Sequence, residues 1–180
     1  MTTYIALLRG INVGGHNLVS MAVLRDLLAD LGYTDGRTLL QSGNLVFRAA
    51  ARASAGLEGV LEREAERRLG LHTRFIVRSA REWRGIIDGN PFHEEAAREP
   101  GRLAVLALTR TPAADRVEAL TAAVRGPEII RAGSKHLYIV YPAGMGTSKL
   151  TLPLIEKHLG SAGTARNWNT VLKLGTLAGA

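Results

Sequence analysis

The side chains that could do chemistry gather in four short polar segments of the sequence. They are "RGINVGGHN", which starts at Arg9, "QSGN", which starts at Gln41, "GMGTSK", which starts at Gly144, and "TARNWNT", which starts at Thr164. These segments carry guanidinium, ammonium, amide and hydroxyl groups, and paired carboxylates are missing from them. Such groups donate hydrogen bonds to phosphate or carboxylate oxygens more readily than they transfer protons. The segments therefore favour anion binding over acid–base catalysis.

The first two segments are expected at one edge of a sheet. Apolar residues predict a strand over 3–9 and a second over 38–41, with an amphipathic helix between them that Ser20 caps. A helical crossover makes two such strands parallel, so both end at the same edge. The side chains expected to converge there are Arg9, Asn12, Asn17, Gln41, Ser42 and Asn44.

These residues also have a simpler interpretation. Asparagine and glycine are common in turns because they tolerate positive φ, and serine or asparagine often caps a helix. A turn needs only one or two such residues, whereas these loops contain several. The sequence leaves both interpretations open.

The "GMGTSK" segment follows a predicted strand and precedes a predicted helix. Glycines ahead of a helix N-terminus can present free N–H groups to an anion, with Ser148 and Lys149 beside it. The segment is not a P-loop, because the serine precedes the lysine and the glycines are only two apart. The alternative is a glycine turn in which Ser148 caps the helix.

The "TARNWNT" segment is expected at the start of the last helix. Trp168 is expected in the core, while Arg166, Asn167 and Asn169 lie off the apolar face and could contact a phosphate or a base edge. The same polar residues could instead cap the helix.

Composition limits the classes of function. The chain has 180 residues, 46% of them hydrophobic, no cysteine and a net charge of +7, so it can bury a core and cannot form disulfides. The first residues lack the features of a signal peptide, and we expect a cytoplasmic protein that does not enter the membrane. The charge favours anionic partners, either a small molecule or nucleic-acid backbone. However, many arginines alternate with glutamates in alanine-rich helices, which is also typical of a solvated surface.

Several chemistries are disfavoured. The five histidines have no metal-ligand spacing, and we expect neither a metal nor another cofactor. No GxSxG motif is present, which argues against a serine hydrolase of that type. Aromatic residues make up only 5% of the chain, which argues against base stacking of the RNA-recognition type.

Hydrophobic periodicity predicts the order β-α-β-β-α-β over residues 1–79. Residues 80–101 are expected to form a helix, opened by a capping box of Ser79 and Glu82, and then a linker, "NPFHEEAAREPG". Residues 102–180 repeat the order, with a helix in place of the last strand. We therefore predict an α/β fold of the α+β type, made of two ferredoxin-like (split βαβ) halves related by topological duplication.

The polar segments also carry a resemblance to a known family. "LLRGINVGGHN", "QSGNLVF", "NPF", "SK" and "TARNWNTVLKL" occur in an order and spacing similar to those of the bacterial domain-of-unknown-function family 1697. The resemblance implies a fold of two ferredoxin-like halves and implies no activity. It adds Gly14 and Gly15 to the candidate ligand-binding residues and matches the polar residues already named.

The leading hypothesis is binding of an anionic ligand, such as a phosphorylated metabolite, a nucleotide or nucleic-acid backbone, in a cleft between the halves. One alternative is an enzyme acting on a nucleotide or phosphate ester. Another is a non-catalytic scaffold whose loops merely turn and whose function lies in protein contacts.

Overall fold

The structure is a computed structural model that describes residues 1–180, and the chain divides into two compact units. Unit 1 comprises Met1–Gly85 with Lys173–Ala180, and unit 2 comprises Ile86–Leu172. The boundaries fall within helix α3 (Ala80–Asp88) and helix α7 (Trp168–Ala178). None of the helices is both long and apolar enough to span a membrane.

Unit 1 has one antiparallel sheet with the strand order β2-β3-β1-β4. Its elements are β1 (Thr2–Leu8), α1 (Met21–Asp30), β2 (Thr34–Leu39), β3 (Asn44–Ala49), α2 (Ser54–Leu69) and β4 (Phe75–Ser79). Strands β1 and β2 both pair antiparallel to β3 and so run in the same direction. Both therefore end at the same edge, as the helical crossover predicted.

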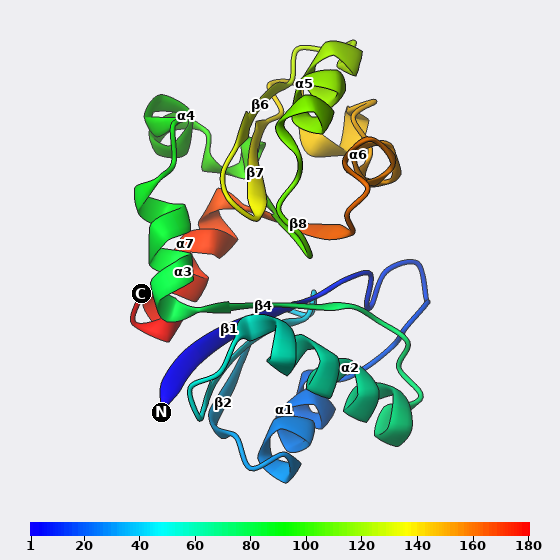
Figure 1. Ribbon diagram of the computed structural model, residues 1–180, viewed down its shortest axis with the longest axis vertical. Coiled ribbons are helices and arrows are strands. Elements are labelled where there is room, and N and C mark those ends of the chain that lie inside the picture. The colour runs from blue at the N-terminus through cyan, green and yellow to red at the C-terminus, as the bar shows by residue number, and fades with distance from the viewer. The chain divides into compact units, whose positions relative to one another are not determined.

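Helices α1 and α2 cover one face of this sheet (Figure 1). Alternate strand residues such as Ala6 and Phe47 pack with Leu24 and Leu61 of the two helices. Residues on the opposite face, such as Ile5, are also fully buried. An uninterrupted apolar strand like β1 is typical of a sheet that is buried on both faces.

Unit 2 also has one antiparallel sheet, with the strand order β6-β7-β5-β8. Its elements, after the short helix α4 (His93–Arg98) and the 3₁₀ turn η1 (Pro100–Arg102), are β5 (Leu103–Leu108), α5 (Ala114–Ala123), β6 (Ile129–Ala132), β7 (His136–Val140), η2 (Met145–Thr147), α6 (Leu152–Leu159) and β8 (Gly163–Asn167). Helices α5 and α6 pack on one face of it (Figure 1).

Two segments differ from the sequence prediction. Residues 163–167, expected to lead into the last helix, form strand β8 along β5, so a strand stands where a helix was expected. The segment was missed because "GTARN" has no apolar alternation. Residues 90–101, expected to be a linker, contain α4 and η1, and Asn90 and Phe92 of that segment are buried.

Helical glutamates accept hydrogen bonds from one edge strand of each sheet. Strand β4 is an edge strand, and the backbone N–H groups of Val77 and Phe75 donate to the carboxylates of Glu58 and Glu62 on α2, at 2.9 and 3.1 Å. On edge strand β8, the N–H of Gly163 donates to a carboxylate on α6 at 2.9 Å. These bonds satisfy donors that an edge strand otherwise leaves unpaired.

The capping box predicted at the start of α3 is present. The N–H of Ser79 donates to Glu82 Oε2 at 2.7 Å, the N–H of Glu82 donates to Ser79 Oγ at 3.2 Å, and the hydroxyl of Ser54 donates to Glu82 Oε2 at 3.0 Å. Burial alone raises the pKa of Glu82, but these bonds together outweigh it and hold the pKa below its ordinary value.

We expect Glu82→Ala to lower the free energy of unfolding by about 1 kcal/mol at pH 7, the usual value of a cap. A carboxyl whose pKa is depressed by folding stabilises the protein above its ordinary pKa of about 4.3, and the stabilisation is lost as the pH falls through the folded-state value. Urea unfolding between pH 3 and 7 measures both effects. Glu82→Gln, which keeps an acceptor but does not titrate, is the control. An alanine variant as stable as the parent at pH 7 would contradict the expectation.

Candidate functional site

The opening loop between β1 and α1 is built around left-handed backbone conformations. Asn12 and Asn17 both have positive φ, at 54° and 49°, and the N–H of Asn12 donates to the carbonyl of Asn17 at 3.2 Å. Gly14 and Gly15 lie between them at the exposed tip of the loop. The loop therefore closes on itself and presents these two residues to solvent.

The structure brings the opening loop and the "QSGN" hairpin into direct contact. The side-chain amide of Asn12 donates to the carbonyls of Val19 at 3.0 Å and Gln41 at 2.8 Å, and its oxygen accepts from the N–H of Val19 at 2.9 Å. Both amide hydrogens of Asn12 are thus used inside the protein. In this structure Asn12 holds the two loops together.

Like Asn12, Asn44 uses its side-chain amide for hydrogen bonds inside the protein. Its side chain is fully buried, and its amide donates to the carbonyl of Leu39 at 2.8 Å and to Ser42 Oγ at 3.0 Å. Beside it, the N–H of Leu8 donates to the carbonyl of Gly43 at 2.8 Å. The Asn44 side chain therefore stabilises the hairpin itself, and the backbone bond from Leu8 to Gly43 joins the hairpin to the end of β1.

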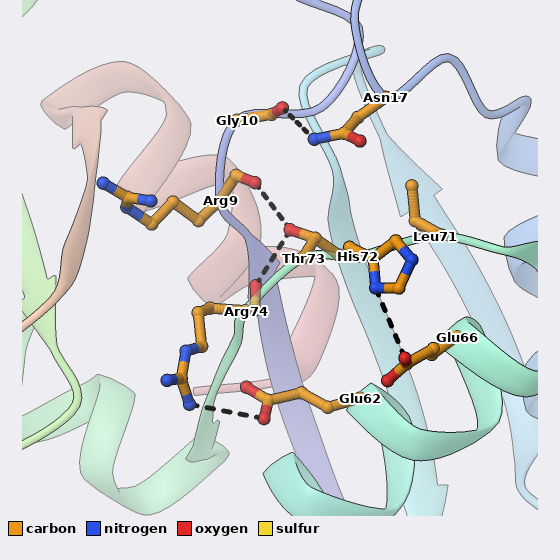
Figure 2. A pocket seen from close by; sticks show the side chains of 9 residues that line it. All are labelled: Arg9, Gly10, Asn17, Glu62, Glu66, Leu71, His72, Thr73 and Arg74. Carbon is orange, nitrogen blue, oxygen red and sulfur yellow. Dashed lines mark hydrogen bonds and ion pairs between the residues drawn. The ribbon is translucent and has the colours of Figure 1, made fainter.

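A surface pocket of about 370 Å³ lies beside the start of the opening loop. Figure 2 shows the residues that line it: Arg9, Gly10, Asn17, Glu62, Glu66, Leu71, His72, Thr73 and Arg74. The pocket is formed where the chain leaves β1 and where it enters β4. The N–H of Arg9 donates to the carbonyl of Arg74 at 3.0 Å, and the hydroxyl of Thr73 donates to the carbonyl of Arg9 at 2.6 Å.

In the pocket, two basic side chains each lie beside a glutamate. Arg74 Nη1 lies 3.6 Å from Glu62 Oε2, and His72 Nδ1 lies 3.4 Å from Glu66 Oε1. In Figure 2 the side chains of Arg9 and Arg74 extend to the left of the view, and those of His72 and Glu66 lie to the right. His72 and Arg74 are largely exposed, with 75% and 63% of the side chain accessible. Such exposed pairs contribute little to stability, so they can open to admit a ligand.

Six of the nine residues that line this pocket lie outside the polar segments of the sequence. Carboxylates are absent from the polar segments, but folding brings Glu62 and Glu66 of α2 beside the opening loop. Their spacing of four residues, which places both on one helix face, was the available signal. His72, Thr73 and Arg74 immediately precede β4, where no sequence motif indicated a site.

The "GMGTSK" segment of unit 2 differs from the predicted anion site. Helix α6 starts at Leu152, and its cap is Thr151, whose hydroxyl accepts from the N–H of Leu154 at 3.4 Å. The hydroxyl of Ser148 instead donates to the carboxylate of Glu128. A carboxylate at this position repels an anion. Ser148 therefore neither caps the helix nor offers its proton to an anion in this structure. Lys149 precedes the helix cap Thr151 by two residues.

Strand β8 places Arg166 and Asn167 in different roles. Asn167 Oδ1 accepts from the N–H of Thr170 at 3.0 Å and so caps α7, which leaves Asn169 exposed in its first turn. Arg166 donates to Thr164 Oγ1 and to the carbonyl of Ala165, both at 2.9 Å. Burial lowers the pKa of Arg166 to about 10, so an anionic neighbour would offset the cost of burying its charge.

Arg166 and Ser148 lie on opposite sides of the unit 2 sheet. Arg166 pairs with Val105 and shares its face, because directly opposed residues point to the same side. Ser148 lines a cavity with Leu106 and Ala165, the next residues along each strand and hence on the other face. The two predicted segments of unit 2 therefore do not form one site within this sheet.

The twelve predicted ligand-binding residues fall into two sets. Unit 1 contains Arg9, Asn12, Gly14, Gly15, Gln41, Ser42 and Asn44, and unit 2 contains Ser148, Lys149, Arg166, Asn167 and Asn169. Their part in ligand binding stays a prediction.

Comparison with known proteins places the chain in a family. The model of a family described as "Protein of unknown function (DUF1697)" matches residues 1–138. The chain belongs to this family. The DUF1697 match contains all the unit 1 candidates and ends before the unit 2 candidates.

A solved structure supports the same fold. The chain is similar to the conserved bacterial protein SP0830 from Streptococcus pneumoniae, with a TM-score of 0.77 and 25% sequence identity over 98% of each chain. The comparison with curated proteins found no match. The family match and the structural neighbour are thus consistent with the α/β fold described above, and neither assigns an activity.

Proposed function

We propose that the protein binds a small anionic ligand in the pocket of unit 1 beside Arg9. The observation that supports this most is that Arg9 and Arg74 line one cavity with His72 and Asn17, next to the loop that the sequence singled out. Guanidinium groups form paired, charge-assisted hydrogen bonds with phosphate and carboxylate oxygens. A volume of about 370 Å³ suits a small metabolite.

The carboxylates narrow the class of ligand. Glu62 and Glu66 line the same cavity, and they would repel a long polyanion such as a nucleic-acid backbone. They would accept hydrogen bonds from hydroxyl or amino groups. We therefore propose a phosphorylated or carboxylated small molecule that also carries hydroxyl or amino groups, such as a sugar phosphate or a nucleotide.

Catalysis is the second candidate, and one observation favours it. His72 Nδ1 lies 3.4 Å from Glu66 Oε1 at the edge of the pocket, and a histidine oriented by a carboxylate is a common general acid or base. Such a pair beside a bound phosphate ester could transfer a proton to or from it. The scaffold hypothesis has no comparable support.

Thermal unfolding in the presence of phosphorylated metabolites, nucleotides and inorganic phosphate tests binding. A ligand at about 100 times its dissociation constant adds roughly 2.7 kcal/mol to the free energy of unfolding. We expect Arg9→Ala or Arg74→Ala to weaken binding by about tenfold, the effect of losing about 1.4 kcal/mol. Arg63→Ala is the control, since Arg63 is exposed on α2 outside the pocket. Unaltered binding in both pocket variants would refute the proposed site.

The same screen separates binding from catalysis. Substrate turnover that His72→Gln reduces, with the dissociation constant unchanged, would favour the enzyme. Binding without turnover of any compound, equal in His72→Gln and the parent, would favour a binding protein.

We also infer that the two units are duplicated ferredoxin-like folds. Each has the element order β-α-β-β-α-β and an equivalent strand order. Backbone hydrogen bonds at equivalent places support this inference. The N–H of Leu8 donates to the carbonyl of Gly43 at 2.8 Å, and the N–H of Leu108 donates to the carbonyl of Lys135 at 2.9 Å. Similarly, the N–H of Arg9 donates to the carbonyl of Arg74 at 3.0 Å, and the N–H of Thr109 donates to the carbonyl of Ala162 at 2.9 Å.

A further inference from the structure

Unit 2 has a cavity of about 280 Å³ at the place equivalent to the pocket of unit 1. It lies where the chain leaves β5 and where it enters β8, and Leu108 pairs there with Gly163, as Leu8 pairs with Phe75 in unit 1. Its lining includes Arg110, Thr111 and Arg116, which follow β5 in the chain, and Gly160 and Ser161, which precede β8. The duplicated topology thus forms a similar hollow twice.

The two cavities differ in charge. The unit 1 pocket contains Glu62 and Glu66, whereas no acidic residue lines the unit 2 cavity. Its ionisable groups are the guanidiniums of Arg110 and Arg116. Both cations are therefore without a carboxylate in the cavity that they share, which is the charge pattern of an anion site.

The guanidinium groups are held in place by carbonyls. Arg110 Nη2 donates to the carbonyl of Gly160 at 3.0 Å, and Arg116 Nη1 donates to the carbonyl of His158 at 3.2 Å. Each bond uses one of the five donors of a guanidinium. The carbonyls at the C-terminal end of α6 carry partial negative charge, which explains why a cation lies here. These two bonds use only a small part of the hydrogen-bond donors that the two arginines supply.

We propose that this cavity is a second anion-binding site, which takes the phosphate or carboxylate group of a small ligand between Arg110 and Arg116. The planar guanidinium fork matches either group. An anion between the two cations would also reduce their mutual repulsion. The site is independent of the proposed pocket beside Arg9, and it uses residues in unit 2 only.

Neither arginine was singled out by the sequence. Arg110 and Arg116 lie about fifty residues from Gly160 and Ser161 in the chain, and no glycine-rich motif marks either segment. Their proximity depends on the pairing of β5 with β8, and β8 itself was missed. The cavity could therefore be recognised only from the folded chain.

Titration calorimetry of the full chain with inorganic phosphate, and separately with citrate, tests the site. We expect the double substitution Arg110→Gln with Arg116→Gln to weaken binding at this site at least tenfold. Glutamine keeps an N–H donor for the carbonyls and removes the charge, which limits any effect on folding. Arg125→Ala, another exposed arginine of unit 2, is the control and should leave binding unchanged.

The variants also separate the two sites. Loss of one binding event in the double variant and its retention in Arg74→Ala support the second site, even if the pocket beside Arg9 binds nothing. Tighter binding of phosphate than of citrate assigns a phosphate ligand, and the reverse assigns a carboxylate. Unchanged binding in a correctly folded double variant, or an equal loss in Arg125→Ala, would overturn the proposal.

Discussion

Replacing Gly43 by alanine is expected to lower the free energy of unfolding by about 3 kcal/mol. Gly43 has a φ of +76°, and a Cβ atom there would lie 2.6 Å from Ile11 Cδ1 and 2.7 Å from Leu8 Cβ. The isoleucine side chain can rotate, but the Cβ of Leu8 is fixed by the backbone of β1. The left-handed conformation costs alanine about 1–2 kcal/mol, and forcing an atom into a packed core costs about 1–3 kcal/mol.

Urea unfolding of Gly43→Ala beside Gly15→Ala measures the steric part of this effect. Gly15 has a nearly identical φ of +78°, but a Cβ atom there would meet nothing within 4 Å. The Gly15 variant should therefore lose only the conformational part, about 1 kcal/mol. Equal losses at the two positions would show that the contact with Leu8 is relieved by a small backbone shift.

Asn12→Ala should lower the free energy of unfolding by roughly 3 kcal/mol. The substitution removes the bonds to the carbonyls of Val19 and Gln41 and the bond from the N–H of Val19. Each such bond contributes about 0.5–1.5 kcal/mol, and alanine is also less favourable than asparagine at a φ of 54°. The opening loop should then separate from the hairpin, which amide hydrogen exchange of residues 10–19 would detect.

Asn12→Gly distinguishes the two contributions. Glycine accepts the left-handed backbone and still lacks the amide, so it should recover about 1 kcal/mol of the loss. If Asn12→Ala is as stable as the parent and only a ligand-induced shift disappears, then Asn12 serves the ligand and its place in the loop is not structural.

The fold could be predicted in large part because its helices and most strands have apolar residues at regular spacing. Strands β1, β3, β5 and β7 are apolar and buried, and the helices between them have apolar faces. Strand β8 escaped prediction because "GTARN" lacks the apolar alternation of a half-buried strand. A Cβ atom at Gly163 would lie 2.9 Å from the carbonyl oxygen of Ala107, so the position needs glycine, which weakens the usual strand pattern.

The candidate site was predictable only at the level of topology. The parallel direction of β1 and β2 brings the opening loop to the hairpin, and the bond from Asn12 to Gln41 joins them. The orientation of an amide is decided by carbonyls that are distant in sequence, so the structural roles of Asn12 and Asn44 could not be read from residue types. The same holds for Glu62, His72 and Arg74, which only the fold places together.

The glutamates along β4 and β8 limit how this protein can recognise an extended peptide. A peptide that adds itself to a sheet as a further strand needs a row of available backbone donors and acceptors. Along β4, Glu58 and Glu62 already accept from Val77 and Phe75, and Glu156 does the same for Gly163. Addition of a strand to β4 is therefore opposed at two of its five residues, and addition to β8 is opposed at Gly163.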